Sequence, residues 1–139
     1  MKQWLRVSML VWSLVGFAGM GAAQEKDTRT PLQKYEGGVI FVSTMCQIEF
    51  RRVQVGGEGN LAECIETGKV TIKADYERAL KTVRKAAAKA ALKEHYIAGI
   101  AALQGISPQF EELKSNYDKR QGDNKNKLDA LWVRFETEN

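Results

Sequence analysis

The sequence contains two cysteines, Cys46 and Cys64, and a glycine-rich segment, residues 56–60, lies between them. Their midpoint is residue 55, directly before that segment. Residues equidistant from the turn of an antiparallel helical hairpin face each other, and the Cα atoms of a disulfide lie about 4.4 to 6.8 Å apart. The spacing therefore predicts two closely packed helices joined by a disulfide, with two buried free thiols as the alternative.

The first 23 residues resemble a secretory signal peptide. Lys2 and Arg6 are basic, residues 7–20 are mainly apolar, and residues 21–23 are small. The apolar run is shorter than the roughly 20 residues that a membrane span needs, so a retained membrane anchor is the less favoured alternative. We expect cleavage before Gln24 and export to a periplasm or out of the cell, where disulfides persist.

Charge and length limit what the rest of the chain can be. The full chain has a net charge of +4, and two of these positive charges belong to the leader. The remaining +2 gives no general reason to expect nucleic-acid binding. Residues 24–30 are polar and predict a flexible lead-in, and residues 31–139 are sufficient for a single helical domain.

A first helix is expected to begin after Thr30. Thr30 and Gln33 have the spacing of a capping box, and Pro31 occupies the first helical position, where its missing N–H costs little. Residues 39–44 taken alone also fit a short strand. The longer helical period favours a helix whose apolar face consists of Leu32, Tyr35, Val39, Val42, Cys46, Phe50 and Val53.

A second helix is expected after Asn60, which is a favourable N-cap residue. Its apolar face consists of Leu61, Cys64, Gly68, Ile72, Tyr76, Ala79 and Val83. A short strand at residues 69–73 is the alternative. The chain then runs without glycine or proline to residue 98, so the second and third helices either form one rod or bend near residues 84–88. The apolar face shifts there, which favours a bend.

The last helix is expected to begin near Ser107 and Pro108, with Gly105 ending the helix before it. Glu111 and Glu112 would then lie in its first turn, where the helix dipole favours acidic side chains. Residues 122–124 are a weak point at which this helix would kink or divide. Together these signals predict an all-α fold, a small antiparallel bundle of three to four helices with one disulfide-stapled hairpin.

The sequence offers little catalytic chemistry. His95 is the only histidine, and a triad or zinc site would need partners that no local motif supplies. We interpret it as a histidine at the edge of a packed face. No nucleophile elbow, phosphate-binding loop or zinc-protease motif occurs. We therefore predict a protein that is not an enzyme, with no catalytic residue, no cofactor and no metal site.

Two features are candidate binding elements. The first is a set of lysines at every fourth position, here called the lysine ridge: Lys81, Lys85, Lys89 and Lys93. It is interpreted either as a solvated helix face or as a docking strip for lipid headgroups, lipopolysaccharide or an acidic protein.

The second is Trp132, which is either a core residue or an aromatic anchor for a partner. The sequence favours an exported module that binds another envelope protein, as an inhibitor, an immunity protein or a chaperone-like factor. A binder of anionic envelope components is the alternative, and nucleic acid is not expected as a partner. The oligomeric state is left open.

Overall fold

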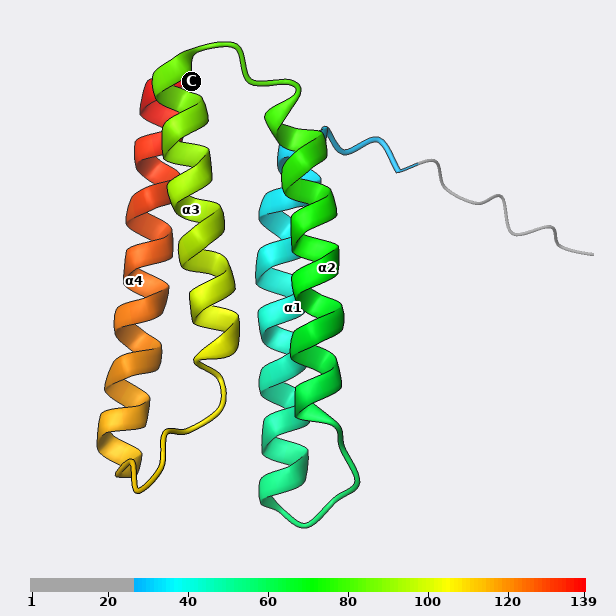
Figure 1. The fold of residues 1–139 in the computed structure, drawn as a ribbon, viewed down its shortest axis with the longest axis vertical. Helices are drawn as coiled ribbons and strands as arrows, with labels where there is room; N and C mark the ends of the chain where they lie inside the picture. The colour runs from blue at the N-terminus through cyan, green and yellow to red at the C-terminus, as the bar shows by residue number, and fades with distance from the viewer. Residues whose placement is uncertain (1–26) are drawn as a thin grey trace, which may run out of the picture.

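The computed structural model describes residues 27–139, and the predicted leader, residues 1–23, lies outside this range. The described chain forms four helices and no strand (Figure 1). They are α1 (Pro31–Gln54), α2 (Leu61–Leu80), α3 (Ala86–Gln104) and α4 (Lys114–Glu138). The all-α bundle is confirmed, and the two alternative strands lie inside α1 and α2. None of these helices is long and apolar enough to cross a membrane.

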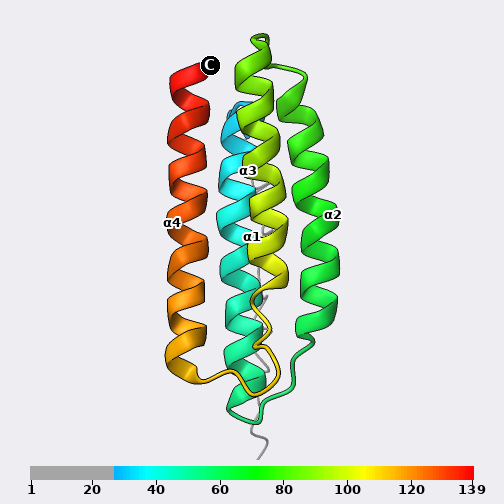
Figure 2. The same cartoon turned by 60° about the vertical axis from the view of Figure 1, so that its left-hand side comes forward.

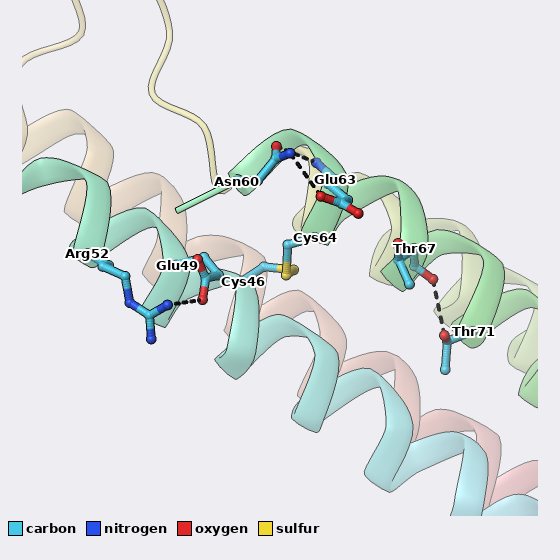
Figure 3. The surroundings of a disulfide bond; sticks show 8 residues. All are labelled: Cys46, Glu49, Arg52, Asn60, Glu63, Cys64, Thr67 and Thr71. Carbon is cyan, nitrogen blue, oxygen red and sulfur yellow. Dashed lines mark hydrogen bonds and ion pairs between the residues drawn. A yellow bond between two sulfur atoms is a disulfide. The ribbon is translucent and has the colours of Figure 1, made fainter. Parts of the chain in front are cut away.

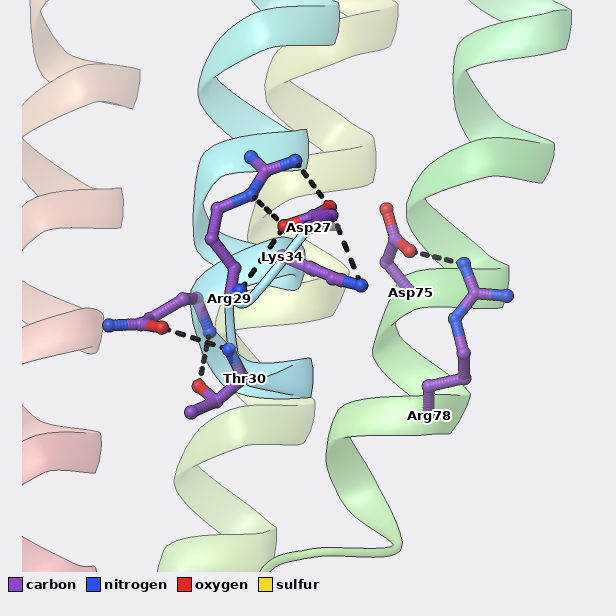
Figure 4. Close-up of polar contacts among 7 residues, drawn as sticks. Asp27, Arg29, Thr30, Lys34, Asp75 and Arg78 are labelled. Atoms are coloured by element: carbon purple, nitrogen blue, oxygen red, sulfur yellow. Dashed lines mark hydrogen bonds and ion pairs between the residues drawn. The ribbon is translucent and has the colours of Figure 1, made fainter. Parts of the chain in front are cut away.

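The predicted start of α1 is confirmed. The Gln33 backbone N–H donates to Thr30 Oγ1 at 3.2 Å, and the Gln33 side chain accepts from the Thr30 N–H at 2.9 Å. Just before the cap, Asp27 pairs with Arg29 and Lys34 at 3.0 and 3.4 Å (Figure 4). The end of the lead-in that the structure describes is thus extended chain held by exposed ion pairs.

The disulfide between Cys46 and Cys64 is present, with Cα atoms 5.6 Å apart (Figure 3). The turn beside it follows from its sequence. Gly56 adopts a φ of 78°, a left-handed conformation that costs glycine nothing. Asn60 then caps α2 by accepting a hydrogen bond from the Glu63 N–H at 3.1 Å. The glycine turn and the disulfide together fix the register of the α1–α2 hairpin.

The second and third helices are separate, and the turn between them spans residues 81–85. This segment contains neither glycine nor proline. Val83 within the turn is 3% exposed, and Ala79 and Ala88 on either side are fully buried. The packing of these three side chains into the core holds the turn against the bundle.

The predicted start of the last helix is wrong. Residues 107–113 form an irregular linker, and α4 begins at Lys114. Glu112 does not lie in the first turn of a helix. Its carboxylate instead accepts hydrogen bonds from Arg120 Nη2 and Nε at 2.6 and 2.8 Å. Arg120 also donates to the carbonyl oxygen of Gly105 at the end of α3. This ion pair holds the linker against α4.

The expected kink or division of the last helix at residues 122–124 does not occur, because α4 continues through these residues without a break.

The four helices form two antiparallel hairpins, α1–α2 and α3–α4 (Figures 1 and 2). The hairpins meet mainly through α2 and α3, and α1 also approaches α3. Within the described chain, no Cα atom of α4 lies within 8 Å of one in α1 or α2. The core therefore gathers around α1, α2 and α3, and α4 contributes one buried side chain to it, Phe135.

Candidate functional site: a groove between α1 and α4

The separation of α1 from α4 leaves a groove of about 640 Å³ along the side of the bundle. Residues of α1 and α4 form its two walls, and residues of α3 and the segment after it form its floor. Aromatic side chains bridge the walls at two levels. The rings of Tyr35 and Trp132 are 6.2 Å apart, and those of Phe50 and Tyr117 are 5.5 Å apart.

The inside of the groove is largely apolar. Its apolar lining residues are Val39, Ile40, Ala102, Ile106, Leu128, Trp132 and Val133. Two of them stand on opposite rims and are well exposed, Ile40 at 62% and Val133 at 60%. Exposed apolar residues that line a concave surface are typical of a binding site rather than of a solvated helix face.

His95 of α3 lies at the floor and is 4% exposed. Its Nδ1 is 2.8 Å from the hydroxyl oxygen of Tyr35 on α1. Burial lowers the pKa of His95 to about 4, although the negative charge of Asp129 acts in the opposite direction. Burial also raises the pKa of the Tyr35 hydroxyl. At neutral pH both groups are therefore uncharged and satisfy each other.

The interpretation of His95 as a packed histidine agrees with this geometry, although the residue is more deeply buried than the edge of a packed face. Its Nε2 makes no hydrogen bond within residues 27–139, and the ring lines the groove. Because Tyr35 engages Nδ1, Nε2 is the ring atom left for an occupant. Sequence reasoning missed the Tyr35–His95 pair because the two residues are 60 positions apart.

Trp132 forms part of the groove wall and is half-buried. Its ring packs against His95 and Phe135, with centroids 5.2 and 5.0 Å away. Its Nε1 donates to Glu136 at 3.1 Å. Trp132 can therefore be both a core residue and an aromatic anchor for a partner, because its ring packs in the bundle while its side chain also lines the groove.

Two carboxylates line the groove near Trp132, Glu36 on α1 and Asp129 on α4. Together with Glu136, which accepts the hydrogen bond from Trp132 outside the groove lining, they are here called the acidic end. Burial raises the pKa of Glu36, and the negative charge of Glu136 on α4 raises it further. Asp129 pairs with Lys125 at 2.5 Å, whereas Glu36 and Glu136 form no ion pair within the described residues. The acidic end thus carries uncompensated negative charge.

A polar extension of about 580 Å³ continues the groove past Gln47 and Gln121. It is lined by the charged residues Arg51, Lys114 and Asp118. Lys114 and Asp118 pair with each other at 2.5 Å. Arg51 is exposed and forms no ion pair with any residue that the structure describes. The groove therefore runs from an acidic end to a basic one.

The lysine ridge lies elsewhere. Its four members are exposed, and none forms an ion pair within residues 27–139. Lys81 follows α2 and Lys85 occupies the N-cap position of α3 without a side-chain capping bond, while Lys89 and Lys93 lie on α3. The ridge therefore crosses the turn between two helices instead of following one helical face, and it is separate from the groove lining.

Among the described residues, no group of three or more His, Cys, Asp or Glu side chains converges to hold a metal ion. Comparison of the chain with protein-family models, with curated proteins and with solved structures finds no match. A function therefore has to be argued from the site itself.

Proposed function

We propose that this protein is an exported binding module without catalytic activity, and that its groove between α1 and α4 binds another protein of the cell envelope. The observation that carries the proposal is the apolar groove with Ile40 and Val133 exposed on its rims. Exposed apolar side chains reduce solubility unless a partner covers them, and covering them contributes about 25 cal/mol for each Å² of apolar surface buried.

Export is supported by two independent features. Residues 1–23 have the pattern of a signal peptide. Cys46 and Cys64 form a disulfide, which is typical of oxidising compartments and rare where thiols are kept reduced. The test is the intact mass of the protein after expression from its full coding sequence. We expect a chain that begins at Gln24 in the exported fraction, whereas a retained leader would contradict export by cleavage.

The absence of catalysis is supported by the state of the groove. His95 is neutral and already bonded to Tyr35. Ser43 and Thr44 both line the groove, and the Thr44 hydroxyl donates to the Ile40 carbonyl oxygen at 2.9 Å. No Ser, Thr or Cys in the described chain is hydrogen-bonded to a histidine, the arrangement that activates a nucleophile.

The experiment compares four forms of the protein as bait in an envelope extract: the wild type, two rim variants and one control variant. Ile40→Glu and Val133→Glu place charges on the groove rims at exposed positions, so folding should be preserved. Val70→Glu is the matched control, because Val70 is 70% exposed on α2 and does not line the groove. We expect one envelope protein to be retained at moderate salt by the wild type and by the control but lost with both rim variants. Equal retention by all forms would reject the groove as the site.

A second candidate function is binding of anionic envelope components through the lysine ridge. It is favoured by the exposure of all four lysines without ion-pair partners in the described chain. Lys89 and Lys93 are four residues apart on α3, where like charges repel each other, and an anionic surface relieves that repulsion. Lys85→Glu combined with Lys89→Glu should then abolish binding to anionic vesicles, and rising salt should weaken the wild-type binding. If the double variant bound vesicles as well as the wild type, the lysine ridge would be excluded as the binding site.

A further inference from the structure

We infer that the segment bound in the groove is an amphipathic α-helix of about four turns, with a basic residue at the acidic end and an acidic residue beside Arg51. This inference rests on the proposed function, because the helix is the part of the partner protein that enters the groove. Beyond the proposed function, it specifies the secondary structure, the length and the charges of the bound segment.

The surface around the groove indicates a protein rather than a small ligand. Beyond Ile40, the outer face of α1 carries three further exposed apolar residues, Phe41 at 65%, Met45 at 40% and Ile48 at 45%. A small molecule held between α1 and α4 would leave this face in water. A protein that inserts a helix into the groove also covers the neighbouring face, which accounts for the whole apolar surface.

The walls of the groove favour a helix over an extended peptide. An extended peptide gains affinity by hydrogen bonding to the edge of a sheet, and the described chain contains no strand. On α1 the groove-lining residues recur every three or four positions at Glu36, Val39, Ile40, Ser43, Thr44 and Gln47. This is the turn spacing of the side chains that an amphipathic helix inserts. Glu36 and Arg51 are 15 residues apart on α1, a length of about 22 Å or four turns.

The charges specify the two ends of the occupant. Glu36 lines the groove on α1 and forms no ion pair within the described residues, and the negative charge of Glu136 on α4 repels it. A Lys or Arg between them removes that repulsion, and an Asp or Glu at the other end meets Arg51. Between the two ends the occupant presents apolar side chains to Leu128 and Trp132 and a hydrogen-bonding group to His95 Nε2.

The probe is a display library of peptides about four turns long, with leucines fixed along one helical face and all other positions randomised. The target is the disulfide-bonded protein produced from the full coding sequence. We expect enrichment of peptides with Lys or Arg at one end and Asp or Glu at the other. Their affinity should fall by about tenfold or more for Ile40→Glu and Val133→Glu, because a charge then faces the apolar side of the helix, and stay unchanged for Val70→Glu.

Charge reversal tests the orientation. Glu36→Lys should weaken the selected peptides by about tenfold, and exchanging the basic residue of the peptide for Glu should restore binding. Glu58→Lys in the glycine-rich turn is the matched control and should have no effect. Enrichment without a preference for basic residues, or equal binding to the rim variants, would overturn the inference.

The inference and the proposed function fail in different ways. Capture of an envelope protein that depends on Ile40 and Val133, with no helical peptide selected, would reject the helix and leave the groove function standing. Capture that does not depend on the rims would reject the groove function. Self-association of the chain that Ile40→Glu abolishes, measured by sedimentation equilibrium, would identify a second copy as the occupant and overturn the partner helix.

Discussion

At the scale of single residues, the buried pair of Tyr35 and His95 is the feature that departs most from a simple packed bundle. The two side chains satisfy each other inside an aromatic cluster that includes Trp132. Protonation of His95 would bury a positive charge away from water, which explains why its pKa lies well below the ordinary value of 6.5. The stability of the fold should therefore depend on pH through this residue.

We predict that His95 makes the protein less stable in acid. At pH 7 the residue is neutral in both the folded and the unfolded chain. As the pH falls through 6.5 the unfolded chain takes up a proton, whereas the folded chain does so only near a pKa of about 4. The free energy of unfolding should thus decrease over this range, by up to about 3 kcal/mol. Urea unfolding at several pH values measures this decrease in the free energy of unfolding.

The matched variant for this prediction is His95→Gln, which keeps a hydrogen-bonding group beside Tyr35 but cannot titrate. Burial also raises the pKa of Glu36, so the difference between the wild type and the variant is needed to isolate the histidine. That difference should grow as the pH falls from 7 to 4. A difference independent of pH would contradict the prediction.

Gly68 is a second residue whose identity the packing decides. A Cβ atom there would collide with Val42 on α1 and lie 3.1 Å from Leu103 Cδ2 on α3. We predict that Gly68→Ala destabilises the fold by about 1 to 3 kcal/mol through overpacking, as measured by urea unfolding. Gly122→Ala is the control, because nothing lies within 4 Å of its Cβ position in α4. It should raise stability by about 0.5 to 1 kcal/mol, and a loss at both sites would refute the packing explanation.

At the scale of elements, the disulfide holds α1 and α2 together beside their glycine turn. It closes a loop with a sequence separation of 18 residues. In the chain-entropy model a loop of this size contributes about 3 kcal/mol to folding. We predict that Cys46→Ala combined with Cys64→Ala lowers the free energy of unfolding by about that amount. Reduction of the wild type should have the same effect on the urea midpoint, and an unchanged midpoint in both experiments would show that the disulfide is not a stabilising element.

At the scale of the whole molecule, α4 is the least anchored helix. Its backbone approaches that of α3 and of no other described helix, and Phe135 is its one buried residue. We predict that the amides of α4 exchange with solvent faster than those of α1 and α2, because a local opening of α4 exposes little apolar surface. Hydrogen exchange followed by mass spectrometry measures this. Equal protection in all four helices would contradict it, and an occupant of the groove should slow exchange in α4.

Much of the fold follows from local sequence signals. The capping box at Thr30, the N-cap at Asn60 and the glycine turn each act within a few residues, so the sequence predicts them directly. The pairing of Cys46 with Cys64 was predictable for another reason, since only one intramolecular pairing exists. The start of α4 was not predictable, because Glu112 is bound by Arg120 and this contact overrides a favourable cap at Ser107.

The sequence by itself thus determined the all-α architecture, the starts of α1 and α2, most of their buried faces and the register of the stapled hairpin, because these depend on periodicity, local capping and one covalent bond. It also named Trp132 as a candidate residue. Only the tertiary structure decided where the groove lies, which residue meets His95 and that the charge of Glu136 acts on Glu36. Those features depend on how the α3–α4 hairpin rests against α1, and that placement is set by side-chain packing between segments far apart in the chain.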